Sequence, residues 1–89
     1  MIALYDLLLK ERNTVTKIKN LETFIQYRKD AIKNFQAIDS TLTPFYIEMC
    51  KDALSELYTD LEANQLILKA IRNEIRMYFE DLKEETNER

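Results

Sequence analysis

Residues 44–85 read PFYIEMCKDALSELYTDLEANQLILKAIRNEIRMYFEDLKEE and decide the fold of this chain. Apolar side chains recur there at alternating intervals of three and four, the period of a long α-helix with one face against another helix. A β-strand would need a period of two. We call this face the seam, and its positions are Ile47, Cys50, Leu54, Leu57, Leu61, Asn64, Leu68, Ile71, Ile75, Tyr78 and Leu82.

The composition favours an all-α fold in a single domain. A chain of 89 residues forms one domain at most. It contains no Gly and only one Pro, so it has few residues suited to the tight turns that an all-β fold needs. The formal net charge of −3 provides no overall attraction to nucleic acid or to an anionic membrane.

The first half of the chain predicts a second helix over about residues 2–38. Residues 39–43 form the predicted loop, with Thr43 as N-cap and Pro44 in the first turn of a helix over about 44–85. The polar tail 86–89 is expected to fray. Since short connections make neighbouring helices antiparallel, the chain predicts a long antiparallel helical hairpin, similar to a coiled coil. Folding back about Thr41 places Asn64 opposite Ile18.

The segment Asn13–Thr16 consists of weak helix formers and is where a kink or break is expected. The apolar positions before and after this segment also fall on two different sets of helix positions, so we expect the seam of the first helix to change phase there. Either the helix runs through, continuous or merely kinked, which we favour, or it stops and restarts with Thr14 as N-cap. The two phases are Leu4, Leu8, Glu11, Val15 and Ile18, followed by Ile18, Leu21, Ile25, Arg28, Ile32 and Phe35.

Apolar residues beside the seam predict self-association, because an exposed apolar surface of this extent usually marks an interaction site. The simplest assembly is a homodimer of two hairpins forming a four-helix bundle. The alternatives are a monomer whose first helix folds over as a third helix, a higher oligomer, and an obligate complex with a different protein. The partner-binding candidates are Tyr46, Met49, Tyr58 and Phe79.

Asn64 is the polar member of the seam, and three interpretations are open. A buried Asn can set the register or the oligomeric state of packed helices. Its side chain could instead bend toward solvent, or it could belong to a functional polar site. We favour a register-setting role, with Thr14 or a backbone carbonyl as partner.

Catalytic and metal-binding chemistry finds little support. The chain has no His, and its single Cys, Cys50, lies on the apolar seam, where a reduced buried thiol is expected. Glu48, Asp52 and Glu56 share a helix face, but they lie off the seam and are expected to be solvated. We therefore predict no enzyme activity, no catalytic residue, no metal and no cofactor.

The location and the partners follow from the same reasoning. A lone reduced Cys, and the lack of a secretory signal or an apolar run of membrane-spanning length, favour the cytoplasm and no membrane partner. Bases outnumber acids between Lys10 and Lys33, which makes Lys17, Lys19, Arg28 and Lys29 a candidate basic face.

These observations predict a small non-enzymatic protein–protein interaction module that presents a helical face, as an adaptor, regulator or inhibitor. The abundance of Lys, Asn, Ile and Glu is typical of AT-rich genomes, such as those of low-GC bacteria and their phages. The alternative is a dimeric regulator that binds nucleic acid through the basic face of the first helix. It has less support, because the acidic second helix would repel phosphate.

Overall fold

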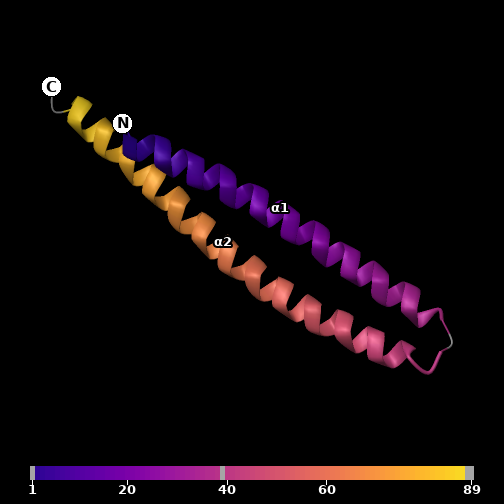
Figure 1. The fold of residues 1–89 in the computed structure, drawn as a ribbon. Helices are drawn as coiled ribbons and strands as arrows, with labels where there is room; N and C mark the ends of the chain where they lie inside the picture. Colours follow the sequence, from indigo (N-terminus) through magenta and orange to yellow (C-terminus); the bar gives the residue numbers. More distant parts are fainter. Residues whose placement is uncertain (1, 39, 88–89) are drawn as a thin grey trace.

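The computed structural model describes residues 2–38 and 40–87. It contains two helices, α1 (Ile2–Gln36) and α2 (Thr43–Asn87), with no strand among the described residues. The helices run antiparallel and side by side, with the connection at one end and α2 extending past α1 at the other (Figure 1). The rod measures 74 × 16 × 15 Å. The predicted all-α antiparallel hairpin is confirmed.

The helix bounds differ slightly from those expected. The connection covers residues 37–42, because α1 ends at Gln36 and α2 begins at Thr43. The Tyr46 N–H donates to the Leu42 carbonyl at 3.1 Å, so Thr43 already lies within the first turn. The Thr43 hydroxyl donates to the Ile38 carbonyl at 2.9 Å and so links the start of α2 to the end of α1. At its other end α2 continues to Asn87, and residues 88–89 of the predicted tail lie outside the described residues.

Helix α1 is continuous across Asn13–Thr16, as the favoured interpretation expects, which excludes the alternative break and the three-helix monomer. The first predicted phase is wrong at Leu8, which is 44% exposed whereas Leu7 is half-buried, but Val15 is half-buried as that phase expects. The error arose because polar residues occupy the true seam, where the Thr14 hydroxyl donates to the Lys10 carbonyl at 2.7 Å. The α1 seam keeps one period through Leu4, Leu7, Glu11, Thr14, Ile18, Leu21, Ile25, Arg28, Ile32 and Phe35.

The core is a single thin layer between the two seams. On α2 every predicted seam residue from Ile47 to Tyr78 is buried or half-buried, while Leu82 is 42% exposed. No side chain among the described residues is less than 2% exposed. Two helices therefore bury only the facing stripe of each other. The buried residues are Ile18, Leu21, Ile25, Cys50, Asn64 and Ile71.

The register agrees with folding about Thr41. Arg72 contacts Glu11 near the open end of the rod, and Tyr46 stacks on Phe35 near the connection. Each of these pairs has its midpoint within one residue of Thr41.

Candidate interaction faces

The seam divides the surface of the hairpin into two flanks. An α-helix turns by about 100° per residue, so the residue before a seam position points to one flank and the residue after it to the other. In this antiparallel pair, the positions that follow the seam lie on the same side of both helices. Lys29 and Tyr58 each follow a seam position, and the Lys29 Nζ lies 5.7 Å from the centre of the Tyr58 ring.

The flank that precedes the seam is largely apolar, and we call it the apolar face. Its large side chains are well exposed: Tyr27 to 68%, Phe24 to 57% and Met49 to 54%. Tyr46 stacks on the ring of Phe35 with centroids 5.3 Å apart, which holds one end of this face in place. The apolar face consists of Phe24, Tyr27 and Ala31 of α1 with Tyr46, Met49, Ala53, Ala63, Ile67, Ala70 and Met77 of α2.

The flank that follows the seam is strongly basic, and we call it the basic face. Nine bases lie at these positions against three acids, Glu22, Glu48 and Glu62. The apolar flank has the opposite balance, since only Lys10 and Lys17 accompany five acids there, Asp6, Glu56, Asp60, Glu74 and Asp81. The bases of the basic face, all exposed, are Arg12, Lys19, Lys29, Lys33, Lys51, Lys69, Arg72, Arg76 and Lys83.

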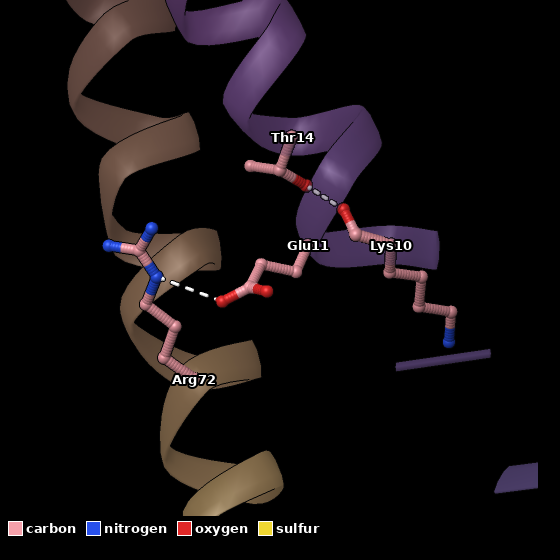
Figure 2. A network of polar contacts seen from close by, with 4 residues as sticks. All are labelled: Lys10, Glu11, Thr14 and Arg72. Carbon is pink, nitrogen blue, oxygen red and sulfur yellow. Dashed lines mark hydrogen bonds and ion pairs between the residues drawn. The ribbon is translucent and has the colours of Figure 1, made fainter. Parts of the chain in front are cut away.

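Among the described residues, one ion pair joins the two helices, between Arg72 of the basic face and Glu11 of the α1 seam. The Arg72 Nε donates to the Glu11 Oε2 at 3.1 Å, while the other two guanidinium nitrogens point away from Glu11 (Figure 2). The side chains are 58% and 30% exposed, so solvent screens the pair and its net stabilisation is at most about 1 kcal/mol. A shallow hollow in the surface of α2 lies beside it, lined by Leu66, Lys69, Ala70, Arg72, Asn73 and Arg76.

The four predicted partner-binding residues do not share one surface. Tyr46 and Met49 belong to the apolar face, whereas Tyr58 and Phe79 follow the seam and lie on the opposite flank. All four are at least 40% exposed. These residues are separated because Tyr46 and Met49 precede seam positions, whereas Tyr58 and Phe79 follow them. Residues on the two sides of a seam position point in opposite directions.

The four predicted basic-face residues are also divided. Lys19 and Lys29 belong to the basic face, Lys17 lies on the opposite flank, and Arg28 occupies an exposed seam position. Sequence reasoning missed the five bases that α2 contributes. The sum of charges over successive segments does not separate the two flanks. Whether each charged residue precedes or follows its nearest seam residue does separate them.

Asn64 is 7% exposed, so the interpretation in which its side chain bends toward solvent is wrong. Its Nδ2 donates to the Asp60 carbonyl at 2.8 Å, one turn earlier on the same helix. The Thr14 hydroxyl likewise bonds within its own helix, so the expected contact between Thr14 and Asn64 is not made. A register-setting role for Asn64 stays a prediction.

Other chemistry is sparse among the described residues. Cys50 is a buried free thiol. No group of three His, Cys, Asp or Glu side chains in the described part of the chain could hold a metal ion. Neither described helix is long and apolar enough to cross a membrane. Comparisons with protein-family models, curated proteins and solved structures give no match.

Proposed function

We propose that this protein is a non-enzymatic interaction module that pairs with a second copy of itself through the apolar face. Two hairpins joined in this way form a four-helix bundle. The remaining helical surface would then act on another protein, as an adaptor, regulator or inhibitor. The observation that carries the proposal is the set of large apolar side chains of this face, which both helices contribute and which are open to solvent in a single chain, although Glu56 and Asp60 interrupt the face along α2.

The surface area supports self-association. The hairpin exposes 7391 Å². A compact monomer of 10.7 kDa exposes about 5500 Å² by the usual scaling of area with mass. The hairpin thus exposes about 1900 Å² more than a compact monomer would. This excess area is larger than the roughly 800 Å² of surface that each partner buries in a standard interface. A two-fold dimer would therefore cover a surface that one hairpin alone leaves in water.

The energy of such an interface is sufficient. Burying one large apolar side chain completely is worth about 1.5–3 kcal/mol, and side chains that are already half-buried gain about half of that. Six large side chains per chain, twelve per dimer, would contribute about 9–18 kcal/mol. This offsets the estimated 4–15 kcal/mol lost on association. The six are Phe24, Tyr27, Tyr46, Met49, Ile67 and Met77.

Two adjacent residues provide a matched test. Ile67 belongs to the apolar face, whereas Leu66 points outward, away from both the seam and this face. In sedimentation equilibrium at tens of micromolar chain, we expect dimers for the natural protein and for Leu66→Glu, and monomers for Ile67→Glu. A monomeric natural protein, or equal dissociation of the two variants, would contradict the proposal.

A further inference from the structure

We propose that the basic face binds the phosphate backbone of a double-stranded nucleic acid. Nine bases against three acids leave this face with a formal charge of +6, although the whole chain carries −3. The chain achieves this by placing most of its acids elsewhere around the rod. A phosphate backbone approaching this flank would therefore meet a local positive field.

The bases form two groups separated along the rod. Arg12 of α1 and Arg72 of α2 lie at about the same height near the open end, and Lys33 and Lys51 do so near the connection. Arg12 and Lys33 are 21 residues apart along α1, and Lys51 and Arg72 are 21 residues apart along α2. At 1.5 Å per residue, the two groups are therefore about 32 Å apart. One turn of B-DNA rises by about 34–36 Å. A rod lying along the duplex would thus place both groups on the backbone, about one turn apart.

Two acids and one base, Lys19, occupy the interval between the two basic groups. Glu22 and Glu62 lie at about the same height, midway between them. Beside Arg72, the hollow also includes Lys69 and Arg76, and Arg76 contacts Asn73 and Glu80 within α2. Lys69 and the two Arg72 nitrogens that point away from Glu11 are the donors there for a phosphate oxygen.

The composition of the face favours a polyphosphate over a protein or a membrane. Protein interfaces are depleted in Lys, yet Lys supplies six of the nine bases here. Membrane-bound amphipathic helices need apolar residues that enter the lipid alongside their bases. Here six large exposed apolar side chains lie on the opposite flank, against four on the basic flank, Tyr5, Leu8, Tyr58 and Phe79. Phosphate binding by Lys and Arg requires no apolar core.

Salt dependence gives the proposal a quantitative form. If the seven bases of the two groups contact phosphates, the logarithm of the binding constant should fall with the logarithm of salt concentration with a slope of about −6. The seven are Arg12, Lys29, Lys33, Lys51, Lys69, Arg72 and Arg76. This binding does not depend on self-association, because the two faces are separate.

The test is fluorescence anisotropy with a labelled mixed-sequence DNA or RNA duplex of about two turns, between 50 and 200 mM salt. Lys33→Gln with Lys69→Gln removes one base from each group. Lys10→Gln with Lys17→Gln removes the same charge from the opposite flank and is the matched control. We expect the first pair to weaken binding at least tenfold at 50 mM salt and to reduce the slope by about 2, with little change for the control.

Three results would overturn the proposal. The first is no binding of the natural protein to either duplex at 50 mM salt. The second is equal weakening by the two variant pairs, which would show that only net charge matters. The third is stronger retention on polyglutamate or on phosphatidylserine vesicles than on either duplex, which would assign the face to an acidic protein or to a lipid surface.

Discussion

Replacing Asn64 with Leu should stabilise the fold by about 1 kcal/mol. The Asn64 side chain is 7% exposed, so an apolar replacement would gain about 1.5–3 kcal/mol of burial. The hydrogen bond from Asn64 Nδ2 to the Asp60 carbonyl would be lost, at a cost of about 0.5–1.5 kcal/mol. The Asp60 carbonyl does not become an orphan, because it also accepts the backbone N–H of residue 64 within α2.

The expected rise in melting temperature is about 5 °C. A chain of 89 residues has an unfolding entropy of about 190 cal/mol/K, so 1 kcal/mol corresponds to roughly that shift. The measurement is thermal unfolding followed by circular dichroism at one fixed chain concentration, because association makes the midpoint concentration-dependent. Gln65→Leu adds similar apolar bulk at the neighbouring exposed position and should change the midpoint little.

The same variant tests whether Asn64 sets the register. If it does, Asn64→Leu should populate more than one oligomer in sedimentation equilibrium while its melting temperature rises. A lower melting temperature would refute the argument, because it would mean that the amide contributes more than the burial of Leu in its place. A higher melting temperature with an unchanged single oligomer would refute the register role alone.

Two further predictions concern individual contacts of the hairpin. Cys50 is 5% exposed on the seam, so a thiol reagent should modify it at least about tenfold more slowly in buffer than in denaturant; equal rates would mean that the seam opens freely. Glu11→Gln should cost at most about 1 kcal/mol, because its partner Arg72 is well exposed, and the cost should vanish in 1 M salt; a larger loss that persists in salt would contradict the solvent-screened geometry.

The hairpin was predictable because apolar residues recur at alternating intervals of three and four over some forty residues. Few structures other than a long helix packed against another helix fit such a pattern. The α2 seam from Ile47 to Tyr78 was identified residue by residue for this reason. The N-terminal half was harder, since Glu11 and Thr14 occupy seam positions where an apolar residue is expected. Apolar Leu8 lies next to the true position Leu7, and Val15 is half-buried beside Thr14, so the sequence suggests a phase that is false at Leu8. Polar seam residues are tolerated here because the core is one thin layer.

The faces could not be predicted from charge along the chain. Lys33 lies near the end of α1 and Lys69 in the second half of α2, so they are far apart in sequence. The antiparallel pairing nevertheless places both on one flank. Conversely, Lys17 and Lys19 are near neighbours in sequence and point to opposite flanks. Only the seam position of each residue, taken together with the direction of the pairing, assigns it to a face. That direction followed from the short connection, but the correct seam of α1 required the structure.

The opposite placement of the two faces leads to a last prediction. A dimer closed through the apolar faces would keep both basic faces outside, on opposite sides of the bundle, so one dimer should join two duplexes. An immobilised duplex should therefore capture a second, fluorescent duplex when the natural protein is added. Ile67→Glu retains its basic face and should bind a single duplex without capturing the second. Equal capture by this variant, or no capture by a natural dimer that binds duplex, would show that the two faces are not used together in this way.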